Sequence, residues 1–234
     1  MEAWHIVGEH LRSGKPIPPD GEWLIHEGEL ALHKSGYHAN KRLIDTLKYA
    51  RGDTSICRVE VGGKIVEDLD ILVAEKRKIL WRVEGEPVLR AFARWCALQV
   101  ADLWDAPELV IEYLATGAEK YREATRLVTY HSYWDLPLKN PFIENSSLYL
   151  TASKKLIEIL AATVTLWATG EYCSACENAK LAAQDSATCL AAVSTYKANT
   201  LIDTIIAQNE QLERMVYEAH NGKKQWTFEY QIKE

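Results

Sequence analysis

The residues best suited to chemistry lie in a Gly-aromatic-His turn, Gly36-Tyr37-His38, where a loop leads into a short helix. Binding and catalytic side chains are often found on loops that a rigid scaffold positions. Tyr49, near the end of that helix, can point toward the same place. We therefore predict that Tyr37, His38 and Tyr49 bind a ligand. The alternative is structural: the His38 imidazole hydrogen-bonds the turn and helps the helix to start, and Tyr49 covers the helix end.

Two cysteines, Cys173 and Cys176, have the spacing of zinc and redox motifs. A structural zinc ion needs about four ligands in a closed tetrahedron, and no second pair of Cys or His residues accompanies them. The two thiols lie in an alanine-rich stretch, where small residues suit packing. The five cysteines follow no framework spacing, so we predict reduced thiols and no metal site.

Three histidines, His26, His33 and His38, alternate loosely with Glu27 and Glu29, so a metal site can be imagined there. No His-x-His or His-x-x-x-His spacing supports it, and a solvated hairpin explains the same residues. The sequence also lacks a Gly-rich phosphate loop, a Gly-x-Ser-x-Gly elbow and a His-Glu-x-x-His motif. These absences count against the common hydrolases and nucleotide-driven enzymes.

The composition is that of a globular protein of 234 residues, with 47% hydrophobic and 26% charged residues. Its net charge of −6 comes without a basic patch, so we expect no direct binding to nucleic acid. The N-terminus lacks a signal-peptide pattern and no apolar run is long enough to span a bilayer. We therefore expect a cytoplasmic protein that does not bind membranes.

Period-two alternation predicts a small antiparallel sheet in the first 85 residues. In the segment 55–61, Cys57, Val59 and Val61 share one face. Gly62-Gly63 predicts a two-residue hairpin directly afterwards, because both residues accept positive φ. Further strands are expected at 64–67, 71–74 and 78–83. Before them, we expect a helix with Asn40 as its N-cap and one buried face, made by Leu43, Leu47 and Ala50.

The rest of the chain is predicted to be helical from Pro87 to Gly222, with a possible break at 134–147. Its 51-residue run without Gly or Pro should also break near 194–199, where helix propensity is weak. Residues 225–233 alternate aromatic and polar side chains like a strand, and we expect that strand to return to the N-terminal sheet. The predicted fold class is α+β. Residues 1–85 with 225–233 form a sheet domain, and residues 86–222 form a helical region.

The run Gly36-Tyr37-His38-Ala39, the helix with Leu43 and Tyr49, and the strand pair around Gly62-Gly63 together resemble a family of uncharacterised phage and prophage proteins. An alanine-rich helical tail completes the resemblance. It implies no reaction, but it implies a mobile-element gene expressed in a bacterial cytoplasm. Accessory proteins of that kind often bind and block a host defence complex, as anti-CRISPR proteins do.

A second resemblance is to the ADP-ribosyltransferase fold, which also places a glycine–aromatic/histidine segment, a short helix and an antiparallel hairpin in series. It implies that Tyr37 stacks on the nicotinamide of NAD and that His38 holds a ribose hydroxyl. A glutamate would stabilise the positive charge of the reacting centre. Glu-x-Glu pairs occur at Glu27/Glu29 and at Glu84/Glu86, and we take Glu84 and Glu86 as the candidates. The Ser-Thr-Ser strand of many such enzymes is absent.

These observations favour a phage-derived accessory protein that binds and inhibits a host protein or defence complex, without a cofactor. The many Trp and Tyr residues suit such an interface. The alternative is an NAD-dependent transferase using His38, Glu84 and Glu86. A third hypothesis is a homo-oligomeric assembly module built on the alanine-rich helices.

Overall fold

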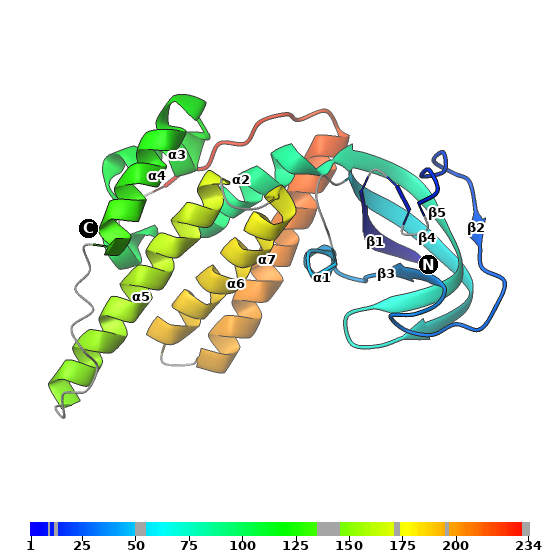
Figure 1. The fold of residues 1–234 in the computed structure, drawn as a ribbon, viewed down its shortest axis with the longest axis horizontal. Helices are drawn as coiled ribbons and strands as arrows, with labels where there is room; N and C mark the ends of the chain where they lie inside the picture. Colours follow the sequence, from blue (N-terminus) through cyan, green and yellow to red (C-terminus); the bar gives the residue numbers. More distant parts are fainter. Residues whose placement is uncertain are drawn as a thin grey trace. The chain divides into compact units, whose positions relative to one another are not determined.

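The computed structural model describes residues 1–8, 10–11, 14–49, 55–134, 146–170, 174–194 and 197–230. The chain divides into two compact units. The sheet unit comprises Met1–Leu89, Ser174–Glu177 and Asn209–Lys224. The helical unit comprises Arg90–Cys173, Asn178–Gln208 and Gln225–Glu234. An antiparallel sheet at the N-terminal end together with several helices confirms the predicted α+β class (Figure 1).

The sheet unit is built on a five-stranded antiparallel sheet. Its strands are β1 (Glu2–Val7), β2 (Leu24–Ile25), β3 (Tyr37–Ala39), β4 (Ser55–Glu67) and β5 (Leu72–Glu84). The order is β1-β4-β5-β2, and β3 pairs with another part of β5. The other three strands therefore all pair with the long strands β4 and β5. β1 pairs with β4, while β2 and β3 pair with successive parts of β5.

The hairpin predicted at Gly62-Gly63 is wrong, because β4 runs through both glycines and turns only after Glu67. The chain reverses at Asp68–Ile71, where the Asp68 N–H donates to the Ile71 carbonyl at 2.9 Å. The two glycines lie where the register with β5 shifts, which marks a β-bulge. Gly63 has φ +72° there, and the following N–H, of Lys64, donates to the Glu75 carboxylate at 2.9 Å.

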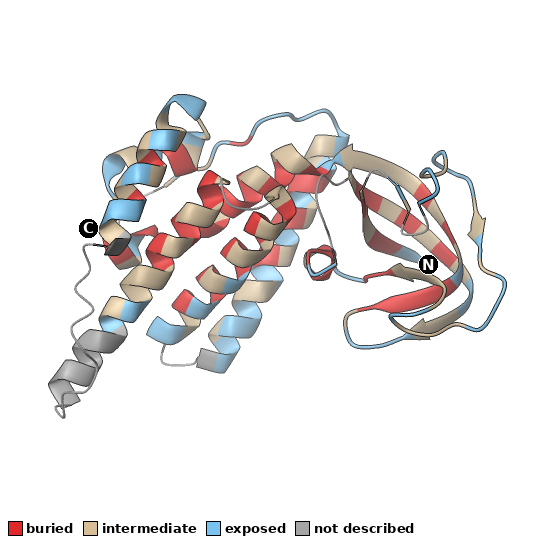
Figure 2. Cartoon of the chain, in the orientation of Figure 1, coloured by how far each residue is buried: buried red, intermediate tan, exposed pale blue. Residues whose placement is uncertain are grey.

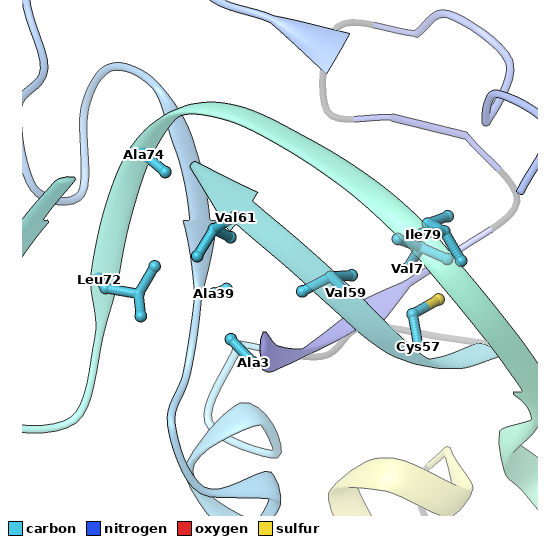
Figure 3. Close-up of a cluster of buried hydrophobic side chains, with 9 residues drawn as sticks. All are labelled: Ala3, Val7, Ala39, Cys57, Val59, Val61, Leu72, Ala74 and Ile79. Carbon is cyan, nitrogen blue, oxygen red and sulfur yellow. The ribbon is translucent and has the colours of Figure 1, made fainter. Parts of the chain in front are cut away.

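The core of the sheet unit lies on one face of these strands. The face predicted for Cys57, Val59 and Val61 is buried, with exposures of 0–1%. Apolar side chains from β1, β3 and β5 join them, so that nine residues form one cluster (Figure 3). They are Ala3, Val7, Ala39, Cys57, Val59, Val61, Leu72, Ala74 and Ile79.

The short helix α1 (Leu43–Thr46) buries Leu43 and Leu47, as predicted, whereas Ala50 lies outside the described residues. The prediction that Asn40 is the N-cap is wrong. The capping position is Arg42, which makes no side-chain cap, and the backbone of Asn40 pairs with Trp4 of β1. The Asn40 amide instead donates to the Asp70 carbonyl, so this residue ties three segments of the sheet unit together.

Seven helices and one 3₁₀ turn are assigned among the described residues. After α1 come α2 (Gly85–Leu98), η1 (Ala101–Trp104), α3 (Glu108–Thr116), α4 (Glu119–Trp134), α5 (Ser146–Thr169), α6 (Ala175–Val193) and α7 (Lys197–His220). The predicted break at 134–147 falls mostly on residues outside the described part. Of the break predicted at 194–199, Ser194 lies outside the helices, residues 195–196 lie outside the described part, and residues 197–199 belong to α7.

Within the helical unit, α5, α6 and the part of α7 up to Gln208 lie side by side (Figure 1). The Trp167 indole N–H donates to the Asp185 carboxylate at 2.9 Å and joins α5 to α6. The Gln208 amide donates to the Ala183 carbonyl at 2.9 Å and joins α7 to α6. Small side chains line the buried side of α6, which lets these helices approach closely (Figure 2). The alanines concerned are Ala179, Ala182, Ala183 and Ala187.

The strand predicted at 225–233 is wrong: residues 225–230 form no strand and belong to the helical unit, while 231–233 lie outside the described residues. The Phe228 N–H donates to the Ala115 carbonyl at 2.9 Å, at the end of α3. The buried Arg94 guanidinium donates to the carbonyls of Leu114 and Trp226 at 2.8 and 3.0 Å. The terminal segment therefore satisfies a buried arginine and the last turn of a helix instead of a sheet edge.

Replacing Gly63 by alanine tests the bulge. At φ +72° the new Cβ would lie 2.4 Å from Glu75 Oε2, so the substitution adds steric conflict to backbone strain. We expect Gly63→Ala to lower the free energy of unfolding by about 2 kcal/mol, measured by urea denaturation. Gly14→Ala is the matched control, because Gly14 has φ +79° and a Cβ added there would meet nothing within 4 Å. An equal loss in both variants would mean that the Glu75 contact plays no part.

Candidate functional site

The sheet unit contains a pocket of about 900 Å³. Residues of β1, β3 and β5, of the turn after α1, and of the loops around β2 line it. All the lining residues belong to the sheet unit. The volume falls in the usual range for sites that hold small molecules.

The charge of the described lining is one-sided. Five histidines, two lysines and one arginine line the pocket, and no aspartate or glutamate does. The histidines are His5, His10, His26, His33 and His38, and the cations are Lys15, Lys48 and Arg77. Lys48 is already paired with Asp70 at 2.6 Å, so Lys15 and Arg77 supply the remaining fixed positive charge. In a protein of net charge −6, this local excess of cations favours a negatively charged ligand.

Arg77 is the most unusual of these residues, because its side chain is buried within β5 with only 5% of its surface exposed. Its Nη1 donates to the His38 carbonyl at 2.5 Å, and its guanidinium lies 5.5 Å from the centre of the Tyr37 ring. Burial lowers the pKa of Arg77 to about 10, which still leaves the group protonated at neutral pH. In the part of the chain that the structure describes, no carboxylate pairs with this charge.

His5 enters the same pocket from β1. Burial lowers the pKa of His5 well below its usual value of 6.5, and the positive charge of Arg77 and the nearby His38 lower it further. The ring is therefore neutral at pH 7. A neutral imidazole beside a buried guanidinium is a group that can accept a proton when the local charge changes.

Aromatic rings form another part of the wall. The rings of His33 and His38 stack with centroids 6.4 Å apart, and the Tyr49 ring lies 6.4 Å from that of His33. The His33 N–H donates to His38 Nε2 at 2.8 Å, so the imidazole of His38 does hydrogen-bond the preceding turn. His33 has φ 62° in this turn, a conformation that few residues other than glycine adopt.

The structure brings together Tyr37, His38 and Tyr49, the three residues predicted to bind a ligand: all three line the pocket. It does not bring Glu84 and Glu86 to them. Glu84 is exposed at the end of β5, where it pairs with Ser55, and Glu86 lies in the first turn of α2.

Sequence reasoning missed Arg77 and His5, the two groups at the centre of the site. A signal for Arg77 was present, since it stands two residues before Ile79 and so shares the inward face of a strand. A charged residue at an inward strand position is rare without a partner and marks a candidate site. Arg77 was missed because one predicted strand ended at residue 74 and the next began at residue 78, so Arg77 was assigned to no strand. In the structure β5 runs through this stretch without a break.

Metal binding finds no geometric support in the described ranges. No group of three or more His, Cys, Asp or Glu side chains there is arranged to hold a metal ion. Of the Cys-x-x-Cys pair, Cys173 lies outside the described residues, and Cys176 is buried with its thiol 3.9 Å from the Leu47 carbonyl. Among the helices described, none combines the length and the apolar character needed to cross a membrane.

Comparison with known proteins adds one finding for this region. Residues 1–91 match a family described as a domain of unknown function (DUF7666). The match covers most of the sheet unit and every residue that lines the pocket. No curated protein and no solved structure matches the chain. None of these comparisons bears on the expected phage origin, which stays a prediction.

The lowered pKa of His5 predicts a pH effect on stability. Below pH 6.5 the unfolded chain binds a proton at His5 that the folded protein resists, so stability present above pH 6.5 is lost as the pH falls toward the folded-state pKa. Urea denaturation in a buffer free of phosphate and sulfate should show this loss, at up to about 1.4 kcal/mol per pH unit for one proton.

The His5→Gln variant should not show the part of the stability loss that protonation of His5 causes. The control variant His10→Gln should still show it, because His10 is exposed. If His5→Gln and the unmodified protein lose stability in parallel between about pH 7 and pH 5, His5 titrates normally and the reasoning fails.

Proposed function

We propose that the sheet unit is a small-molecule-binding module whose pocket holds a ligand with a carboxylate or phosphate group on Arg77. One observation carries this proposal: a buried guanidinium faces a pocket in which the described lining has no carboxylate. Burying a charge without a partner costs several kcal/mol, so a fold that keeps one there is expected to use it.

The hydrogen bonds of Arg77 support the same interpretation. One nitrogen donates to the His38 carbonyl, and the remaining N–H groups donate to no acceptor among the described residues. A guanidinium presents its N–H groups as a planar fork that fits the two oxygens of a carboxylate or phosphate. The fixed contact to His38 holds the fork in place before a ligand arrives, which reduces the entropy lost on binding.

The rings of Tyr37, His33 and Tyr49 would contact the apolar part of such a ligand, and flat aromatic groups suit them best. NAD, which combines phosphates with flat rings, is one candidate that meets both requirements. Since Glu84 and Glu86 do not line the pocket, the proposal concerns binding, and an ADP-ribosyl transfer reaction stays a prediction of the second resemblance.

Thermal melting with anionic ligands tests the proposal, and the probes are sulfate, benzoate and NAD. At least one of them should raise the melting temperature, because a ligand that binds only the folded state stabilises that state. Arg77→Met should abolish the shift. Arg82→Met is the matched control, since Arg82 lies on the same strand but pairs with Asp20 and does not line the pocket.

Arg77→Met can also disturb the fold through the lost bond to His38, so a second variant is needed. Lys15 lines the pocket from an exposed position, and Lys15→Met should weaken binding roughly three- to tenfold without changing the melting temperature of the ligand-free protein. If none of the three probes shifts the melting temperature at millimolar concentration, or if Arg82→Met behaves like Arg77→Met, the anion site is refuted.

Inhibition of a host protein or defence complex remains a separate proposal that the first resemblance supports. A pull-down from bacterial cells followed by mass spectrometry tests it, and capture of a defined defence complex is the result expected. If no such complex is recovered, the inhibition proposal is refuted and the ligand-binding proposal is unaffected.

A further inference from the structure

We infer that the pocket takes up a proton together with its anionic ligand, and that His5 carries this proton. The inference rests on the proposed anion site at Arg77. It adds a property that the site would not need for binding alone: an affinity that rises as the pH falls.

The sheet register brings His5 and Arg77 to the same side. His5 is paired with Cys57 across β1 and β4, and Arg77 is paired with Val61 across β4 and β5. Cys57 and Val61 both face the core, because they are separated by an even number of positions in one strand. Both side chains therefore enter the pocket from the core face, and both line it.

The groups around His5 are cationic, neutral or weakly acidic. Arg77 of β5 and His38 of β3 act on it directly, and both disfavour its protonated form. The other titratable groups of the described lining come from β3, from the loops and from the turn after α1. They are Tyr37 of β3, His10, Lys15, His26, His33, Lys48 and Tyr49. Cys57 of β4 does not line the pocket but acts electrostatically on Arg77.

An anion seated on Arg77 reverses this balance. It places negative charge where the described lining supplies none, and it offsets the positive charge of Arg77, which adds to burial in lowering the pKa of His5. The imidazole then gains a partner for its protonated form. Two other histidines are less suited to the role, because His38 Nε2 accepts the His33 N–H and His26 Nε2 is hydrogen-bonded to Ser35 Oγ at 2.9 Å.

The consequence is a linked equilibrium. If one proton binds with the ligand, the affinity can rise by up to about tenfold for each pH unit below the pKa that His5 has in the complex. Well above that pKa the affinity is independent of pH. No bond is formed or broken in this step other than the transfer of a proton from buffer to the imidazole nitrogen.

Isothermal titration calorimetry with sulfate and with benzoate tests the inference, because neither probe changes its own charge between about pH 6 and pH 8. Titrations in buffers of different ionisation heat give the number of protons taken up. We expect uptake near zero at the higher pH and a substantial fraction of one proton at the lower. His5→Gln should abolish the uptake while sulfate or benzoate still binds. His131→Gln, a change at an exposed histidine of α4 that does not line the pocket, should leave the uptake unchanged.

The outcomes separate the two proposals. Binding without proton uptake, or uptake that persists in His5→Gln, overturns the inference and leaves the anion site standing. Failure of sulfate, benzoate and NAD to bind at either pH overturns the proposed function and the inference with it. Binding of sulfate alone assigns the site to phosphate-like ligands, and binding of benzoate alone assigns it to carboxylates; either is compatible with the inference if His5→Gln removes the uptake.

Discussion

The antiparallel ladder between β4 and β5 is the interaction on which the sheet unit depends. Along its whole length β1 pairs with β4, and the two short strands β2 and β3 pair with successive parts of β5. Neither short strand could persist alone, because two or three residues cannot offset their own ordering entropy. The ladder therefore sets the positions of Tyr37 and His38 in β3, of His5 in β1 and of Arg77 in β5, and with them the wall of the pocket.

The same ladder explains how a charged side chain can be buried in the sheet. Arg77 stands at an inward position beside an apolar cluster, yet its guanidinium meets the His38 carbonyl and the face of the Tyr37 ring. Both contacts come from β3, which pairs with Leu72–Ala74 of β5, whereas Arg77 itself pairs with Leu24 of β2. These contacts satisfy the group only partly, since a carbonyl and a ring supply no negative charge. What remains is a positive potential directed into a pocket, and it adds to burial in keeping His5 neutral.

Two departures from the sequence-based expectations have physical causes in long-range contacts. Gly62-Gly63 has the local chemistry of a tight hairpin, but the Glu75 carboxylate accepts the Lys64 N–H and the bulge lets β4 continue. Residues 225–230 have the alternation of a strand, but the Ala115 carbonyl and the Arg94 guanidinium bind their backbone instead. In each case a local pattern allowed two structures, and a partner distant in sequence decided between them.

Local chemistry was sufficient for several features of this protein. The alternation of Cys57, Val59 and Val61 determined which face of a strand is buried, the 3.6-residue period determined where helices run, and the Gly36-Tyr37-His38 turn marked one wall of the pocket. Only the tertiary structure decided that Arg77 faces that pocket without a carboxylate and that His5 stands beside it. The reason is that the free energy of a buried charge depends on which groups surround it in space, and those groups come from strands up to about seventy residues apart. Periodicity within one segment carries no information about such neighbours.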